Sequence, residues 1–192
     1  MKGLYIFLGI VVVLVLMGGC SYNGMNASRV KANQAWANVQ SSYQRRSDLI
    51  PNLVETVKGV ANFETTTLTQ VIQERASATS IKIDPKDLSP EKLKEFQASQ
   101  GQLSQALGRL MVVSEQYPQL KANENFKSLQ DQLEGTENRI KVSRDEYNAA
   151  VGEYNVKVTS FPGNIMASIF GFKERGMFEA DQAAQSAPKV KF

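Results

Sequence analysis

Apolar residues recur every three or four positions along most of this chain, which is the spacing of one face of an α-helix. The pattern predicts three long amphipathic helices, each marked by a stripe of mainly apolar residues. The first stripe contains Trp36, Val39, Tyr43, Arg46, Ile50, Leu53, Val57 and Val60 and resumes at Leu68, Val71 and Ile72. The second contains Leu93, Phe96, Gln100, Leu103, Leu107 and Leu110. The third contains Phe126, Leu129, Leu133, Ile140, Tyr147, Val151, Tyr154 and Val158.

Turn-forming residues separate these helices. Residues 78–88 contain an Asp-Pro pair and are predicted to form a loop. Residues 89–91, Ser-Pro-Glu, then offer an N-cap, a proline for the first turn and an early acid, which together begin a helix. Pro118 ends that helix, and Asn123 caps the next one.

The end of the chain adds one short element. Residues 161–163, Phe-Pro-Gly, close the third helix, and the apolar residues 164–170 are predicted to fold back as a short fourth helix. We therefore expect an all-α fold: an up-and-down antiparallel helical bundle of three long helices plus a short fourth, over residues 21–178. Residues 179–192 are small and polar, and a disordered tail is expected there.

Pro51 lies inside the first stripe, in the segment RRSDLIPNLVETVK. The stripe keeps its phase on both sides of the proline, which favours one kinked, continuous helix. Its ring would then displace the hydrogen bond to the carbonyl of Ser47. The alternative is a helix that begins at Ser47 or Asp48, with Pro51 in its donor-free first turn.

Residues 1–20 are predicted to form a membrane anchor. Lys2 precedes an uncharged apolar run, Gly3–Gly19, as in a bacterial export signal. As a helix this run would span about 25 Å, which is somewhat less than the hydrocarbon core of a bilayer. The length favours a cleaved signal, whereas snorkelling flanks would let a retained transmembrane helix fit as well.

Cys20 is a candidate lipid-attachment residue. The preceding residues 17–19, Met-Gly-Gly, resemble a bacterial lipobox, although lipoboxes most often have leucine where this chain has Met17. A diacylglycerol on the thiol would anchor everything after it. Arg29 and Lys31 compete with Lys2 for the cytoplasmic side, yet we expect the bundle to lie outside the cytoplasmic membrane.

Composition removes several classes of function. The 22 basic and 19 acidic residues are well mixed, without the basic cluster that nucleic-acid binding requires. The chain has no histidine and one cysteine, so it lacks the residues of histidine-based catalytic triads and of the usual zinc sites. We expect no enzymatic activity, no cofactor and no nucleic-acid partner.

Charged residues on the predicted helices have structural explanations. Asp131, Glu134 and Glu137 share a face, but di-metal sites in bundles also need histidines, so a solvated acidic face is favoured. Arg46 occupies a core position and is expected to pair with Glu137 or Glu64, which would fix the register of the helices. A separate surface pair of Arg45 with Asp48 is expected.

Two dipeptides, Tyr147-Asn148 and Tyr154-Asn155, repeat at an interval of seven residues on the third helix. The spacing places both tyrosines on the stripe and both asparagines beside it. Buried amides in a helical seam usually fix alignment. Asparagines in an exposed groove would instead recognise a partner peptide.

Three segments resemble the LemA family of bacterial proteins: AWANVQSSYQRRSDLIPNLVETVKGVANFE, EQYPQLKANENFKSLQDQLEGTENRIKVSRDEYNAAVGEYN and TSFPGNIMASIFGF. The likeness covers Tyr22 to Glu179. It implies an α-helical bundle behind a membrane anchor, in a family without an established enzymatic activity, and it carries over no catalytic residue. The residues that match the family motifs, and are candidates for structural or partner contacts, are Arg46, Asp48, Asn52, Glu64, Glu137 and Arg144.

We therefore expect a non-enzymatic, membrane-anchored envelope protein whose bundle acts as a scaffold or adaptor for another envelope protein. Formation of oligomers is compatible with this role. One alternative is an oligomeric membrane-remodelling protein, which requires an exposed apolar patch beyond the anchor. Another is a histidine-free enzyme, which requires a polar cleft that holds Arg46 and Asp48 with Glu64 or Glu137.

Overall fold

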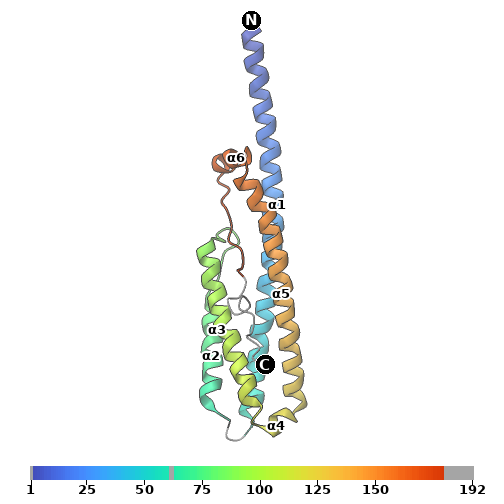
Figure 1. Ribbon diagram of the computed structural model, residues 1–192, viewed down its shortest axis with the longest axis vertical. Coiled ribbons are helices and arrows are strands. Elements are labelled where there is room, and N and C mark those ends of the chain that lie inside the picture. The colour runs from blue at the N-terminus through green and yellow to red at the C-terminus, as the bar shows by residue number, and fades with distance from the viewer. Residues whose placement is uncertain (1, 61–62, 180–192) are drawn as a thin grey trace, which may run out of the picture.

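The computed structural model describes residues 2–60 and 63–179, and every regular element in that part of the chain is a helix (Figure 1). The elements are α1 (Lys2–Lys58), α2 (Thr65–Ser80), α3 (Pro90–Ser114), α4 (Pro118–Lys121), α5 (Glu124–Thr159) and α6 (Gly163–Phe170). The expected all-α bundle is confirmed. The predicted tail lies outside the described residues beyond Glu179.

The helices form two pairs that run along the same long axis. α1 and α5 lie side by side, and α2 lies beside α3 (Figure 1). The N-terminal part of α1 projects beyond the other helices, and α6 sits where α1 leaves the bundle. The predicted short fourth helix is thus confirmed as α6.

The predicted stripes form the core. Every stripe residue of α3 and α5 is buried, and so are the α1 stripe residues from Trp36 to Val57. Aliphatic side chains around Leu53 fill the half of the bundle near α4. Aromatic rings fill the other half, where Trp36 lies edge-on to Phe96 with ring centroids 5.4 Å apart. The spacing of apolar residues therefore located the buried faces of these helices correctly.

α1 passes through Pro51 without interruption, so the prediction of a continuous helix is confirmed. Proline has no N–H to donate to the carbonyl of Ser47, one turn earlier. That carbonyl accepts a hydrogen bond from Nε of Arg75 on α2 at 2.9 Å instead. Because Ser47 is buried, this bond satisfies an oxygen that would otherwise lack a partner.

The predicted extent of the first helix was wrong. Its stripe resumes at Leu68, but α1 ends at Lys58, and Leu68 belongs to the separate helix α2, which begins at Thr65. The turn begins at Gly59 and is fixed by Phe63, whose ring packs 4.8 Å from the ring of Tyr117. Both helices face the same core, which is why their stripes look like one. Within residues 2–60 and 63–179 the bundle therefore has four long helices, α1, α2, α3 and α5.

The predicted caps are present. Oγ of Ser89 accepts a hydrogen bond from the N–H of Lys92 at the start of α3. Oδ1 of Asn123 accepts hydrogen bonds from the N–H groups of Asn125 and Phe126 at the start of α5, at 2.9 and 3.2 Å. These bonds satisfy donors that the first turn of a helix leaves unpaired.

Candidate functional site: a groove between α3 and α5

An extended segment, residues 171–179, follows α6 and runs back along the bundle (Figure 1). We call it the C-terminal strap. Gly171 ends α6 with φ of 71°, a left-handed conformation that glycine adopts without strain. The strap lies against α5 and the start of α3, so its backbone groups must find partners on those helices.

Side-chain amides of α5 bind the strap backbone in pairs of hydrogen bonds. Asn155 donates to the carbonyl of Arg175 at 2.8 Å and accepts from its N–H at 3.0 Å. Asn148 does the same with Phe178, at 2.9 and 2.8 Å. Each asparagine therefore binds one strap residue through its backbone alone, whatever side chain that residue carries.

The two tyrosines of the repeated dipeptides add to this arrangement. The hydroxyl of Tyr154 donates to the carbonyl of Lys173 at 2.8 Å, and that of Tyr147 donates to the carbonyl of Gly176 at 3.0 Å. The partners of both dipeptides therefore lie three residues apart on the strap. Seven helical residues rise about 10.5 Å and three extended residues span about 10 Å, so the two spacings match.

A third amide continues the series from the other wall. Gln97 of α3 donates to the carbonyl of Glu179 at 2.9 Å and accepts from its N–H at 3.2 Å. Arg144 of α5 donates to the same carbonyl at 2.9 Å, and its guanidinium lies 4.9 Å from the ring centre of Phe178. The strap is therefore held from both helices where its described part ends.

The strap is also tightly packed. The N–H of Gly176 donates to the carbonyl of Leu88 at 3.0 Å, and a side-chain carbon added to Gly176 would lie 2.7 Å from Cα of Pro90. Only glycine fits at that contact. The ring of Phe178 packs against the rings of Trp36 and Tyr147, with centroid distances of 6.3 and 5.5 Å. The strap thus contributes Phe178 to the aromatic half of the core.

Burial changes the acidity of groups under the strap. Desolvation raises the pKa of Tyr147 to about 12 and also raises the pKa of Tyr154, while the positive charge of Arg175 opposes both shifts. Desolvation lowers the pKa of Arg175, whose guanidinium lies 5.2 Å from the ring of Tyr154 and donates to the carbonyl of Pro85. Neither tyrosine ionises at neutral pH.

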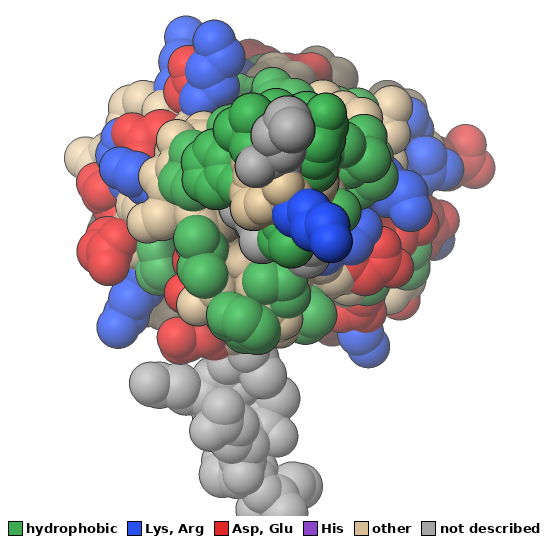
Figure 2. Space-filling view, turned by 90° about the horizontal axis from the view of Figure 1, so that it is seen from above, with side chains coloured by type: hydrophobic (Ala, Val, Ile, Leu, Met, Phe, Trp, Pro, Cys, Tyr) green, Lys and Arg blue, Asp and Glu red, His purple; other side chains and the backbone are tan. Residues whose placement is uncertain are grey.

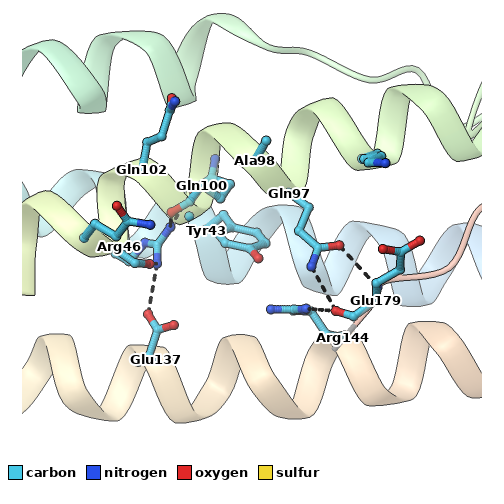
Figure 3. A pocket seen from close by; sticks show the side chains of 13 residues that line it. Tyr43, Arg46, Gln97, Ala98, Gln100, Gln102, Glu137, Arg144 and Glu179 are labelled. Atoms are coloured by element: carbon cyan, nitrogen blue, oxygen red, sulfur yellow. Dashed lines mark hydrogen bonds and ion pairs between the residues drawn. The ribbon is translucent and has the colours of Figure 1, made fainter. Parts of the chain in front are cut away.

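A cleft between α3 and α5 adjoins Glu179, the last described residue of the strap (Figure 3). We call this cleft the open groove; its volume is about 580 Å³. Residues of α1, α3 and α5 and the last strap residue line it, among them Tyr43, Arg46, Gln97, Gln100, Ser104, Gln105, Glu137, Arg144 and Glu179.

Arg46 of α1 lies at the floor of the open groove, where its side chain is 2% exposed. Nη1 donates to Oε2 of Glu137 at 2.9 Å and to Oγ of Ser104 at 2.8 Å. Nη2 donates to Oε1 of Gln100 at 2.6 Å and to its carbonyl at 3.3 Å (Figure 3). The guanidinium also lies 5.0 Å from the ring of Tyr43. One arginine thereby joins α1, α3 and α5.

The other candidate residues of the sequence lie elsewhere. Asp48 is exposed and accepts a hydrogen bond from Gln44 at 2.7 Å; no ion pair with Arg45 occurs among the described residues. Asn52 is exposed on α1, and Glu64 is exposed just before α2. The structure thus brings together Arg46, Glu137 and Arg144 only, and the polar cleft that the enzymatic alternative requires lacks Asp48 and Glu64.

The hydrogen bonds of Gln97 and Gln100 were not predicted from the sequence. Gln100 occupies an otherwise apolar stripe position, which was the available sign of a buried polar contact. Gln97 has no such sign, because its partner is the backbone of a segment distant in sequence. Asp131 and Glu134 are exposed, as a solvated face would have them.

The end of the bundle near α6 is apolar. α1 is long and apolar enough to cross a membrane, with a mean hydropathy of 2.5 over an 18-residue window. Cys20 follows the apolar run Gly3–Gly19 on α1 and is exposed. Next to it, α6 and the residue before Pro162 expose a group of side chains that we call the apolar collar: Phe161, Ile165, Ile169 and Phe170.

These features define the class of the protein. It is a membrane-associated all-α bundle whose first helix begins with an apolar segment. The LemA family model matches residues 35–192, and the chain belongs to the LemA family. The resemblance inferred from the sequence is thereby confirmed.

Curated relatives come from bacteria. The chain is 30% identical over 167 residues to magnetosome protein MamQ 2 of Paramagnetospirillum magneticum, which covers 78% of this chain and 61% of that protein. It is 28% identical to magnetosome protein MamQ of Magnetospirillum gryphiswaldense, covering 86% and 67% of the two chains. Protein LemA of Metamycoplasma hominis is 26% identical, over 75% and 62%. The chain thus spans about six tenths of the length of the first of these relatives.

Proposed function

We propose that this protein is a non-enzymatic, membrane-anchored adaptor of the bacterial cell envelope that binds an extended segment of another envelope protein in the open groove. In this proposal the bundle lies outside the cytoplasmic membrane. One observation carries it: paired amide bonds from both groove walls hold the protein's own strap by its backbone, and a cleft lined by the same two helices adjoins the last described strap residue.

Backbone-directed binding supports an adaptor role because it selects an extended conformation more than a particular sequence. The open groove offers groups of the same kind. Gln102 and Gln105 of α3 line it and are exposed, and Ser104 lies between them. Arg46 and Glu137 close its floor as a neutral pair, so a polypeptide entering the groove meets no uncompensated buried charge there.

The number of available bonds indicates the strength of such a complex. A hydrogen bond exchanged with water contributes roughly 0.5–1.5 kcal/mol net. A few of them, without a deep apolar pocket, are consistent with a transient complex that benefits from confinement at the membrane. This is the behaviour expected of an adaptor rather than of a permanent subunit.

Anchoring at Cys20 forms part of the proposal. Its exposure leaves the thiol accessible, and the lipobox-like residues before it favour a lipidated form over a retained transmembrane helix. The intact mass of the protein extracted from membranes distinguishes the two forms. Loss of residues 1–19 with an added diacylglycerol is the expected result, whereas a full-length mass that includes Met1 rules lipidation out.

Photocrosslinking in cells tests the adaptor role. With p-benzoylphenylalanine in place of Gln105, which lines the open groove, we expect crosslinks to an extended segment of one envelope protein, identified by mass spectrometry. The matched control carries the same residue in place of Gln73, which is exposed on α2 away from this groove. Equal crosslinking at both positions, or a protein isolated gently as a monomer without partner, would count against the proposal.

A second candidate function is membrane remodelling by oligomers. The observation that favours it is the apolar collar, an exposed apolar patch on the bundle beyond the anchor. The full chain reconstituted in large vesicles should then form oligomers and deform the vesicles into tubes. Unchanged vesicles at high protein density would exclude this function and leave the adaptor role intact.

A further inference from the structure

The apolar collar exposes large side chains on one side of α6. Ile165 and Ile169 lie four residues apart on α6 and share one helix face, and Phe161 lies in the turn just before the helix. Phe161 is 81% exposed and Ile169 is 67% exposed. The opposite face of α6 carries Met166 and Ala167, which pack against the bundle. A helix that is apolar on both faces needs an apolar environment on its outer side as well.

Contacts with α1 fix the level at which the collar lies. Sδ of Met166 lies 3.8 Å from the position that a side-chain carbon on Gly18 would take. The ring centre of Phe170 lies 5.0 Å from that of Tyr22. The apolar run of α1 ends at Gly19, so α6 lies beside the end of that run. Figure 2, seen from the N-terminal end, shows hydrophobic side chains gathered around α1 and charged side chains around the rim.

The charges around α6 are arranged as they are in a membrane-interface element. The sequence has no charged residue between Lys157 and Lys173. Lys157 donates to Oγ of Ser28 at 2.6 Å, which ties the charged end of α5 to α1 just below the collar. Lysines at such positions keep their ammonium groups among lipid headgroups while their stems lie along apolar surface.

The geometry points to one occupant for this surface. We infer that α6 lies in the boundary between headgroups and acyl chains of the bilayer that α1 enters, with the exposed side chains of Phe161, Ile165 and Ile169 immersed in lipid. The collar is continuous with the exposed apolar residues of α1, and it supplements a run that is about 25 Å long against a hydrocarbon core of roughly 30 Å.

The inference holds for either form of the anchor. Cys20 and Phe161 line the same surface hollow between α1 and the end of α5. A diacylglycerol on Cys20 would therefore enter the bilayer beside Phe161. A retained transmembrane helix would enter the bilayer at the same place. In both cases the collar makes a second, non-covalent contact with the membrane and fixes the tilt of the bundle over its surface.

Quenching of tryptophan fluorescence by brominated acyl chains tests the inference on the full chain. Phe161→Trp and Ile169→Trp place a reporter in the collar, and the control variants Val112→Trp and Val142→Trp place it at positions that are also more than half exposed but lie away from α6. Trp36 is the only native tryptophan and is fully buried. It lies 17 residues beyond Gly19, which is about 25 Å along α1.

Each protein is reconstituted in vesicles of phosphatidylcholine and phosphatidylglycerol, with and without bromine on the acyl chains. Both collar variants should lose emission intensity in brominated vesicles and emit at shorter wavelength, while both controls and the native protein should not. Equal quenching at collar and control positions, or none at either, would overturn the inference. If the emission shifts to shorter wavelength without quenching, and this shift grows with protein density, the collar binds a second copy of the chain instead.

Discussion

Arg46 offers a quantitative test of how the bundle is held together around the open groove. Three substitutions separate its contributions: Arg46→Ala removes charge, hydrogen bonds and volume, Arg46→Met keeps most of the volume, and Glu137→Gln removes only the partner's charge. The structure gives each a different expected cost, because Arg46 is 2% exposed whereas Glu137 is 58% exposed.

The partners that remain decide the magnitudes. Without the guanidinium, the carboxylate of Glu137 is solvated by water at little cost in free energy. The buried Oε1 of Gln100, however, loses the donor that lies 2.6 Å away. An unpaired buried acceptor costs about 1–3 kcal/mol, which is the expected loss for Arg46→Met. The cavity left by Arg46→Ala raises the loss to about 3–5 kcal/mol. Glu137→Gln keeps a neutral acceptor at a half-exposed site and should cost about 1 kcal/mol or less.

The assay is urea unfolding of the full chain in detergent, followed by the fluorescence of the buried Trp36. The free energies of unfolding should fall in the order wild type, Glu137→Gln, Arg46→Met, Arg46→Ala. If Glu137→Gln cost as much as Arg46→Ala, the exposed ion pair rather than the buried hydrogen bonds would hold the helices. If Arg46→Met were as stable as the wild type, the polar contacts would contribute nothing net.

Three further predictions follow from single contacts. Arg75→Ala should lower the free energy of unfolding by about 1–2 kcal/mol in the native chain. The loss should be smaller in a Pro51→Ala background, because the new N–H can donate to the carbonyl of Ser47, and a double-mutant cycle measures the difference. Burial raises the pKa of Tyr147 from 10.0 to about 12, so the stability of the folded state should fall as the pH rises from 10 toward 12, and Tyr147→Phe should flatten this part of the pH profile. Asn148→Ala removes two hydrogen bonds and should release the strap locally, at about 2 kcal/mol, which amide hydrogen exchange of the strap detects.

Much of the fold follows from the sequence because helical packing leaves a periodic trace. The stripe through Trp36, Tyr43 and Ile50 is buried as its spacing predicts, and the continuity of α1 at Pro51 follows from the same phase. The turn after Lys58 left no such trace, since α1 and α2 face one core and their stripes agree by geometry rather than by continuity. Periodicity identifies the buried face of a helix, but it does not show whether two stripes belong to one helix.

The candidate site was less accessible to pattern analysis. The pairing of Arg46 with Glu137 could be anticipated because a charge on an apolar stripe needs a partner. Glu64 met the same requirement in the sequence, but α1 continues for 12 residues after Arg46 and Glu64 lies exposed beyond its end, just before α2. Asn52 and Asp48 match family motifs but lie at exposed positions of α1, away from the open groove.

The repeated Tyr-Asn dipeptides show why the strap could not be predicted from its own sequence. Residues 171–179 have no helical stripe and no alternation of a strand, because their backbone pairs with side chains rather than with another strand. The information lies on α5: an interval of seven helical residues equals the span of three extended residues, about 10 Å. A helix that carries amide side chains at this interval beside an apolar stripe can hold an extended chain by its backbone. Gln97 of α3 binds the last described strap residue in the same way, at the point where the open groove begins.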